Sequence, residues 1–298
     1  MSEHHHHHPV SGKNLFITIV LNIIITLSQI VGGILSGSLA LLSDAMHNLS
    51  DVVALLIAYW ANKISSKPKN NQKTFGYKRA EIIAALFNAS ALFGIALFLI
   101  IEAIHKFLNP ETIDSILVIA LGFLSIVLNA ISVLLIKDDA KHNMNMKAAY
   151  VHLLTDVMTS VAVVVGGLLM YYFNLFWIDS IITVLIAGYL IKASYALIVE
   201  SISILMQSVP DDINIDELKI DIEKYEPIDN IHHLHIWKLD DHDIHLEAHI
   251  DFNENLALKE VTKICDEISD AIKKKYHITH MTIQPEYEKN DNKELIYS

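Results

Sequence analysis

Six long apolar segments limit what this chain can fold into. They lie at residues 14–35, 39–62, 81–105, 113–136, 148–172 and 177–197. Each reaches the length of about 20 residues that a helix needs to cross a bilayer. Hydrophobic residues make up 52% of the 298 residues, which is high for a soluble domain. The pattern predicts an all-α bundle of six transmembrane helices over residues 14–208.

Positive charges predict the orientation of these segments. Lysine and arginine gather in the second and fourth connections, at residues 63–79 and 137–147, and neither occurs between the fifth and sixth segments. Because cytoplasmic loops carry an excess of these residues, we expect both connections and both termini in the cytoplasm. The single cysteine, Cys265, excludes an intrachain disulfide and agrees with a reducing compartment.

Residues 1–13 are predicted to form a His-rich cytosolic arm. The run His4–His8 fits either an expression tag or a native arm that gathers metal, and the sequence does not separate the two. The apolar segment that follows lacks a small-residue cleavage site and precedes five further segments. We therefore expect it to be retained as a helix rather than cleaved as a signal peptide.

The last third of the chain changes character. Residues 1–208 contain 12 acidic and 12 basic residues, whereas residues 209–298 contain 22 acidic and 10 basic ones. Periodicities in the order helix-strand-strand-helix-strand predict a cytosolic α+β domain of ferredoxin-like type at residues 209–287. The polar tail at residues 288–298 is expected to be disordered. An acidic domain argues against nucleic acid as a partner and suits a domain that meets cations.

Ionisable residues recur in two of the apolar segments. Asp44, His47 and Asp51 lie in the second segment, and His152 and Asp156 lie in the fifth. A charge at the centre of a membrane costs about 2.5–3.5 kcal/mol on insertion scales, so the presence of each ionisable residue there requires a structural or functional explanation. A four-residue spacing places the members of each His-x-x-x-Asp pair on one helix face. Two imidazoles and two carboxylates form a suitable donor set for one four-coordinate divalent metal.

This donor set favours reversible binding. A single buried His or Asp is often explained by a neighbouring polar group, but two matched pairs on separate segments point to a shared ligand. Imidazole suits zinc and other late divalent ions, and the membrane part contains no thiolate that would hold zinc tightly. Metal must displace protons from such ligands, so the site can exchange an ion for protons. Asp44 is expected to orient His47, to line the access path or to bond to another helix.

Histidines gather in the C-terminal domain. As a group on an acidic domain they favour metal binding, although each alone is more simply explained as a surface residue. Strand alternation predicts that His233 and His235 share one face while His232 points to the other. Eight of the 17 histidines lie here: His232, His233, His235, His242, His245, His249, His277 and His280.

Five stretches together resemble the cation diffusion facilitator family, and specifically its bacterial zinc-resistance branch, which is CzcD-like. The similarity covers roughly residues 13–286. The stretches are Ser38 to Asp51, Lys73 to Glu81, His152 to Asp156, His233 to Trp237 and Thr282 to Glu286.

The resemblance implies a homodimer in the bacterial cytoplasmic membrane that exports Zn²⁺ in exchange for protons. The family's tetrahedral transport site corresponds to His47, Asp51, His152 and Asp156, between the second and fifth membrane helices. Cd²⁺ and Co²⁺ accept the same donors. The resemblance also implies that the cytosolic domain dimerises and binds regulatory zinc.

The cytosolic ligands and one charge pair are also implied by the resemblance, with two departures. His232, His249 and Glu286 correspond to cytosolic ligands, with His233, His235 and His280 as further candidates. Arg79 corresponds to a residue that forms a salt bridge with the start of the cytosolic domain, here Asp211 or Asp212. Some relatives hold an extra metal where this chain has Asn70, Lys73 and Tyr77, and some have a histidine at the place of Ile283. We therefore expect no metal at the first of these places.

Two other functions compete with a proton-coupled exporter. A membrane-anchored metal sensor would use the cytosolic histidines and need no ionisable residues in its spans. A passive metal channel would conduct zinc without regard to a pH gradient. None of the three is an enzyme, and the paired motifs favour the transporter because an anchor gains nothing from buried charges.

Overall fold

The structure is a computed structural model that describes residues 12–65, 67–137, 144–240 and 243–296. The chain divides into two compact units. The helical unit comprises Met1–Tyr59 and Phe87–Ile198, and the C-terminal unit comprises Trp60–Leu86 and Val199–Ser298. The run His4–His8 and His242 lie outside the described residues.

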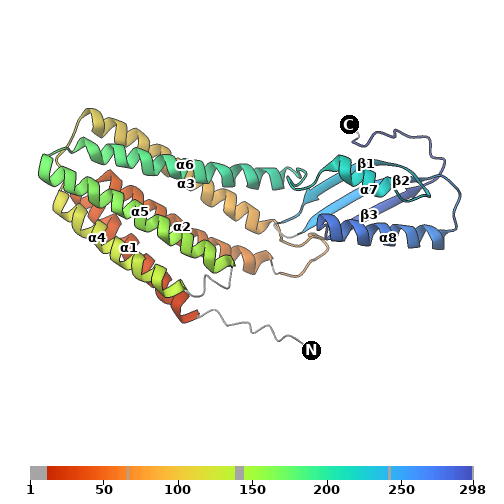
Figure 1. Ribbon diagram of the computed structural model, residues 1–298, viewed down its shortest axis with the longest axis horizontal. Coiled ribbons are helices and arrows are strands. Elements are labelled where there is room, and N and C mark those ends of the chain that lie inside the picture. Colours follow the sequence, from red (N-terminus) through yellow and green to blue (C-terminus); the bar gives the residue numbers. More distant parts are fainter. Residues whose placement is uncertain (1–11, 66, 138–143, 241–242, 297–298) are drawn as a thin grey trace. The chain divides into compact units, whose positions relative to one another are not determined.

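Six long helices come first and follow the six predicted segments in order (Figure 1). Their ends extend past the apolar cores, most clearly at the C-terminal end of the sixth. The helices are α1 (Gly12–Ser36), α2 (Leu39–Ser65), α3 (Ala80–Leu108), α4 (Ser115–Ile136), α5 (Met144–Phe173) and α6 (Trp177–Leu205).

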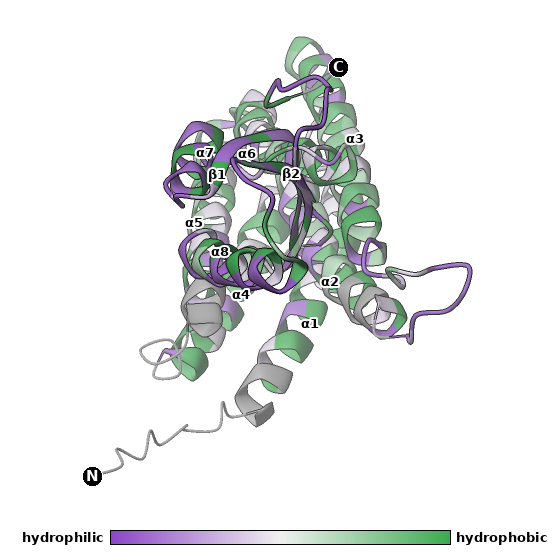
Figure 2. Ribbon diagram, turned by 90° about the vertical axis from the view of Figure 1, so that its right-hand side faces the viewer, coloured by the Kyte–Doolittle hydropathy of each residue, from purple (hydrophilic) through white to green (hydrophobic). Residues whose placement is uncertain are grey.

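Five of these helices are long and apolar enough to cross a membrane, counted over the described residues. They are α1 and α3 to α6, and their hydrophobic colouring dominates Figure 2. The helix that falls outside this set is α2, which carries Asp44, His47, Asn48 and Asp51. Five apolar helices therefore accompany one helix that carries several polar residues, and the transmembrane fold class is confirmed.

Close packing joins α4 to α5. A Cβ atom on Gly122 would come within 2.7 Å of a methyl group of Val164, and one on Gly167 would come within 2.8 Å of Ile119. Contacts this short require glycine, because membrane helices associate through close backbone approach rather than through exclusion of water. The helix α5 of this closely packed pair carries His152 and Asp156.

A buried aspartate fixes the start of α2. Asp179, at the N-terminal end of α6, accepts hydrogen bonds from the backbone N–H groups of Leu39, at 2.7 Å, and of Ala40, at 3.4 Å. It also accepts one from the Ser38 hydroxyl group. The first N–H groups of a helix have no partner within the helix, so this carboxylate caps α2 from a different helix. Asp179 is only 1% exposed.

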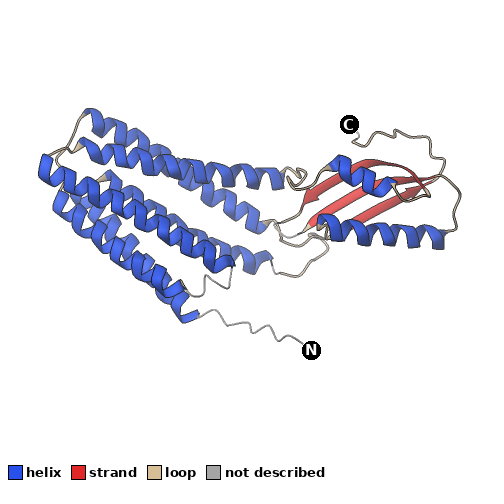
Figure 3. Cartoon of the chain, viewed as in Figure 1, coloured by secondary structure: helices blue, strands red, loops and turns tan. Residues whose placement is uncertain are grey.

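The C-terminal unit contains a small α+β domain, as predicted (Figure 3). Its elements are α7 (Ile215–Glu223), β1 (Ile228–Lys238), β2 (Ile244–Phe252), α8 (Leu258–Tyr276) and β3 (His280–Glu286). The sheet has the order β1-β2-β3, with β1 and β2 antiparallel and β2 and β3 parallel. Alternate residues of β2, such as Leu246 and Ile250, pack with Ile222 and Ile268 of the two helices. The opposite face of the sheet is left for polar side chains.

The segment that follows β3 differs from the expectation of disorder. Leu234 donates a backbone hydrogen bond to the carbonyl of Leu295, at 2.8 Å, and His233 donates one to Glu294, at 3.3 Å. The Leu295 side chain packs against the domain core. The open edge of β1 offers unpaired backbone groups, and this segment satisfies part of them.

Asp221 connects the two helices of the domain and predicts a pH effect. It accepts hydrogen bonds from the ammonium groups of Lys224 and Lys275 and from the Tyr276 hydroxyl. These donors, Lys224 foremost, hold the pKa of Asp221 well below its usual value. A lowered folded-state pKa adds stability above the unfolded pKa of about 4, and this stability is lost as the pH falls through the folded-state value.

We therefore expect Asp221→Asn to lower the stability of the domain at neutral pH and to weaken its dependence on acid. Hydrogen exchange of α7 and α8 amides, measured from neutral pH down to about pH 3, would show the wild-type and variant protection beginning to converge at the acidic end. Parallel curves over the whole range would contradict this role.

Candidate metal centres

Helices α2 and α5 bring three of the four predicted ligands of the first site together, His47, His152 and Asp156, with Asp51 beside them. The Nε2 atom of His47 lies 3.4 Å from Oδ1 of Asp156, and Nε2 of His152 lies 3.1 Å from Oδ2 of Asp51. Within each helix, the histidine and the aspartate four residues later are 3.8 Å apart. The two imidazole rings meet edge to face, with centroids 5.5 Å apart.

Burial and missing hydrogen bonds show that this cluster suits a cation. His47 is 7% exposed and Asp156 is fully buried. Neither ring nitrogen of His47 and neither carboxylate oxygen of Asp156 makes a hydrogen bond among the described residues. Buried polar atoms normally have partners, and a divalent ion could bind one ring nitrogen of His47 together with a carboxylate oxygen of Asp156. Donor atoms of His47, His152 and Asp156 lie within 4.8 Å of one another, whereas Asp51 is not a member of this converging group and approaches it through His152.

Asp44 has a different environment. Its carboxylate accepts hydrogen bonds from Gln29 of α1 at 2.5 Å, from Thr159 at 2.8 Å and from Ser160 at 3.1 Å. The side-chain amide of Asn48 in turn donates a hydrogen bond to the side-chain oxygen Oε1 of Gln29. Of the three roles expected for Asp44, the contacts agree with bonding to other helices, because they join α1, α2 and α5. Sequence reasoning missed Gln29, although a lone glutamine in an apolar span is a usable signal.

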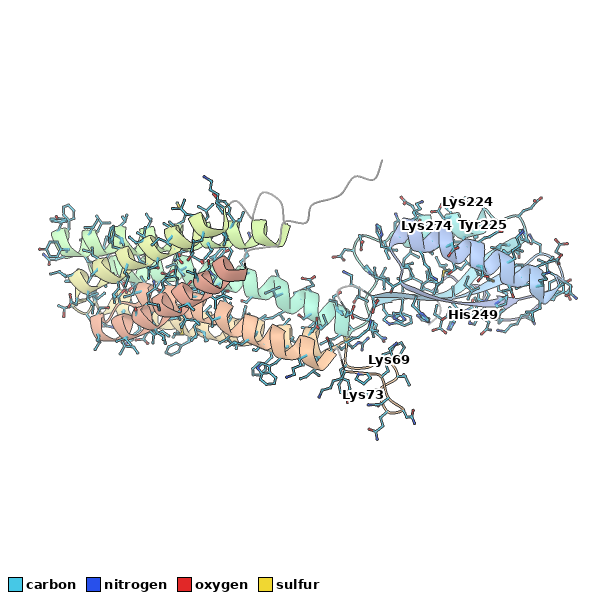
Figure 4. The ribbon with its side chains drawn as sticks, turned by 90° about the horizontal axis from the view of Figure 1, so that it is seen from below. Lys69, Lys73, Lys224, Tyr225, His249 and Lys274 are labelled. Carbon is cyan, nitrogen blue, oxygen red and sulfur yellow. The ribbon has the colours of Figure 1, made fainter. Side chains whose placement is uncertain are left out.

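A second cluster lies on the polar face of the sheet in the C-terminal unit. His232 on β1 and His249 on β2 face each other in register, with ring centroids 5.3 Å apart. Glu286 at the end of β3 places Oε1 3.0 Å from Nδ1 of His249 and Oε2 3.5 Å from Nε2 of His232. Figure 4 labels His249 on the side of the sheet away from α8. Neither ring nitrogen of His232, which is 1% exposed, makes a hydrogen bond within the described part of the chain.

Burial and hydrogen bonds shift the pKa values of two groups in this second cluster. Burial lowers the pKa of His249, although Glu286 beside it acts in the other direction. Burial works against ionisation of Glu286, but hydrogen bonds from Lys289 and Gln284 outweigh it and lower the pKa of that carboxyl group. Both shifts favour a neutral imidazole beside a carboxylate, the forms that bind metal.

The predicted separation of the β1 histidines is wrong. His233 stacks on His249, with ring centroids 4.6 Å apart, and His235 meets His233 at 4.9 Å. His232 contacts the same His249 ring instead of pointing to the other face. The pairing register shifts between His232 and His235, and His233 has a φ of 50°. This β-bulge breaks the two-residue alternation on which the prediction relied.

The remaining candidates lie elsewhere in the C-terminal unit. His280 contacts His245, with ring centroids 4.8 Å apart, and is not among the residues whose donor atoms converge with those of His232. Lys78 forms ion pairs with Asp240, at 3.6 Å, and with Asp243. Among the described residues, no ion pair joins its neighbour Arg79 to Asp211 or Asp212. A lysine one position earlier thus connects the segment before α3 to the β1–β2 connection.

The two parts of the chain define a class of protein: a helical membrane domain with a buried His/Asp cluster, followed by a small α+β domain. Two family descriptions match these parts. A cation efflux transmembrane domain matches residues 15–206, and the cytoplasmic domain of cation efflux proteins matches residues 210–288. The chain belongs to the cation efflux family, which is a family of transporters.

Similar proteins carry names that agree with this family. The cadmium, cobalt and zinc/H(+)-K(+) antiporter of Bacillus subtilis is 34% identical over 295 residues, which are 98% of this chain and 94% of the relative. The metal cation efflux system protein CzcD of Cupriavidus metallidurans is 34% identical over 94% of this chain and 89% of its own length. The zinc transporter ZitB of Escherichia coli is 31% identical over 88% and 83%.

Proposed function

We propose that this protein exports Zn²⁺ from the cytoplasm in exchange for protons, with Cd²⁺ and Co²⁺ as further substrates. The ion would bind tetrahedrally between α2 and α5 to His47, Asp51, His152 and Asp156. One observation carries the proposal: the ring nitrogens of His47 and the carboxylate oxygens of Asp156 are buried, are as close as 3.4 Å and make no hydrogen bond to any residue that the structure describes. The names of the relatives support the choice of ions.

Proton exchange follows from the donor set. Imidazole has a pKa of about 6.5 in water, so proton and metal compete for it in the physiological range. Zn²⁺ leaves such a site more readily than a thiolate site, and protons entering from the outer side assist its release. Alternating access would open the site first to the cytoplasm and then to the outside.

The C-terminal domain adds a regulatory role to this proposal. His232, His249 and Glu286 would hold cytosolic zinc, because the buried imidazole of His232 has no hydrogen-bond partner among the described residues. We propose a homodimer through this domain, in the bacterial cytoplasmic membrane, with both termini in the cytoplasm. The lysine-rich connections between α2 and α3 and between α4 and α5 support that orientation.

Zinc uptake into inverted vesicles with an imposed proton gradient tests the proposal. Wild-type protein should take up zinc when the vesicle interior is acidic, and Asp51→Ala and His152→Ala should not. Uptake by both variants at the wild-type rate would exclude the site. Zinc flux that ignores the gradient would instead indicate a passive channel.

The sensor alternative predicts a different pattern. Removing residues 209–298 would abolish every metal response, while variants of α2 and α5 would change little. The buried pair of His47 and Asp156, which face each other at 3.4 Å, counts against it, because an anchor does not need such a pair.

The donor set also predicts a change in selectivity. His47→Asp replaces an imidazole with an oxygen ligand, and oxygen ligands suit Mn²⁺ better than Zn²⁺. We expect the ratio of zinc to manganese uptake to fall by at least about tenfold, since one ligand in four changes type. Parallel uptake of both ions into the same vesicles would measure it, and an unchanged ratio would show that His47 does not select the ion.

A further inference from the structure

The segment that follows β3, residues 287–296, lies against the second metal cluster; we call it the tail. Two backbone hydrogen bonds to β1 and the packing of Leu295 hold its far end. The stretch between Glu286 and Glu294 must therefore cross the polar face of the sheet beside His232. Three charged side chains of this stretch reach the cluster: Lys289, Asp291 and Lys293.

Asp291 completes a four-donor group. Its Oδ2 atom lies 3.6 Å from Nε2 of His232, almost the same distance as Oε2 of Glu286. One donor atom each from His232, His249, Glu286 and Asp291 lie within 4.8 Å of one another. Two imidazoles and two carboxylates repeat the donor set of the membrane site, and the fourth member comes from the tail.

The ammonium groups of two tail lysines contact the carboxylate oxygens of Glu286 and Asp291. Lys293 lies 2.8 Å from Oδ2 of Asp251, 2.5 Å from Oδ1 of Asp291 and 3.8 Å from Oε2 of Glu286. Lys289 donates to Oε1 of Glu286 and lies 3.1 Å from Oδ2 of Asp291. The lysines thus compensate two of three carboxylate charges without a metal ion.

A divalent cation and these lysines compete. Adding two positive charges while both ammonium groups stay would leave the cluster positive, with cations a few ångströms apart in a partly buried place. Like charges at such distances repel one another. The metal is therefore expected to displace the ammonium groups and to keep the carboxylates.

We propose that the tail supplies Asp291 as a fourth ligand of the cytosolic site, and that Lys293 and Lys289 are internal competitors that metal must displace. The inference rests on the cytosolic zinc site proposed above. It makes zinc binding an exchange of cations on the same carboxylates, so the lysines set the zinc concentration at which the site fills.

Titration calorimetry with zinc chloride tests this on the purified full-length protein carrying His152→Ala, which removes the membrane site from the titration. Asp291→Asn should lower zinc affinity at least about tenfold, the scale seen when support of a metal ligand is lost. Asp291→Glu should largely restore it. Lys293→Gln should raise the affinity several-fold, whereas Lys263→Gln, an exposed lysine on α8 paired with Glu267, should leave it unchanged.

The two variants are expected to change zinc affinity in opposite directions, and this difference distinguishes competition from structural support. If the tail only braced the sheet, Asp291→Asn and Lys293→Gln would both weaken binding, and that result would overturn the inference. Wild-type affinity in Asp291→Asn would overturn it too. Hydrogen exchange provides a second measurement: zinc should protect tail amides in the wild type and in Lys293→Gln but not in Asp291→Asn.

Failure of the underlying site gives a different result. If His249→Gln in the same background removes no zinc binding, the cytosolic site itself is absent. If His249→Gln removes it while the tail variants bind like wild type, the site stands and the role of the tail is wrong.

Discussion

Replacing Asp156 with asparagine is expected to abolish proton-driven zinc flux while the helical unit stays folded. The carboxylate is fully buried and has His47 at 3.4 Å and His152 at 3.8 Å. Asparagine has the same shape but no charge, so a metal would lose an anionic ligand at the deepest point of the site. We expect uptake into inverted vesicles to fall at least about 100-fold, or about 2.7 kcal/mol.

Asp44→Asn is the matched control. Asp44 is also a buried carboxylate of the helical unit, but Gln29, Thr159 and Ser160 already donate hydrogen bonds to it. The amide keeps one acceptor oxygen, so part of this network survives and flux should fall far less. If Asp44→Asn abolished zinc flux while Asp156→Asn left it normal, the roles that we assign to the two residues would be reversed.

Asp179→Ala is expected to cause the largest loss of stability among the polar substitutions in the helical unit. It removes the partner of the Leu39 and Ala40 N–H groups and of the Ser38 hydroxyl, all of them buried. Each buried donor left without a partner costs about 1–3 kcal/mol, so for these three donors we expect a loss of at least about 3 kcal/mol. Thermal unfolding of the detergent-solubilised protein would measure it.

Asp114→Ala provides a comparison of the same chemistry. Asp114 caps α4 by accepting from Leu117, but it is exposed and acts within its own helix. Water can replace an exposed cap, so the loss should be about 1 kcal/mol. Equal losses in the two variants would show that the link between α6 and α2 adds nothing to an ordinary cap.

Local pattern was sufficient to predict the elements of this fold. Apolar runs of span length gave six helices in the right order, and alternation gave the three strands of the C-terminal domain, so the fold class is confirmed. The four-residue spacing of His47 and Asp51, and of His152 and Asp156, indicated one face of each helix. The structure brings these faces together, while the assignment of the four as ligands stays a prediction.

Features that depend on contacts distant in sequence could not be predicted. The cap from Asp179 to α2 joins residues 140 positions apart in the chain, and no local pattern reports it. The bulge at His233 changes the faces of the β1 histidines, although every residue there is compatible with a regular strand. The tail looked disordered because it is polar, but its lysines and Asp291 find partners on a sheet whose surface the sequence does not describe.

The polarity of α2 has a consequence for biosynthesis. Asp44, His47 and Asp51 make this helix costly to release alone into lipid, since each ionisable residue near mid-membrane adds an insertion penalty. Gln29 of α1 is made before α2 leaves the ribosome, but Thr159 and Ser160 follow more than 100 residues later. We therefore expect α2 to stay at the insertion machinery beside α1 until α5 arrives. The residues proposed to carry zinc would then also set the order in which the protein enters its membrane.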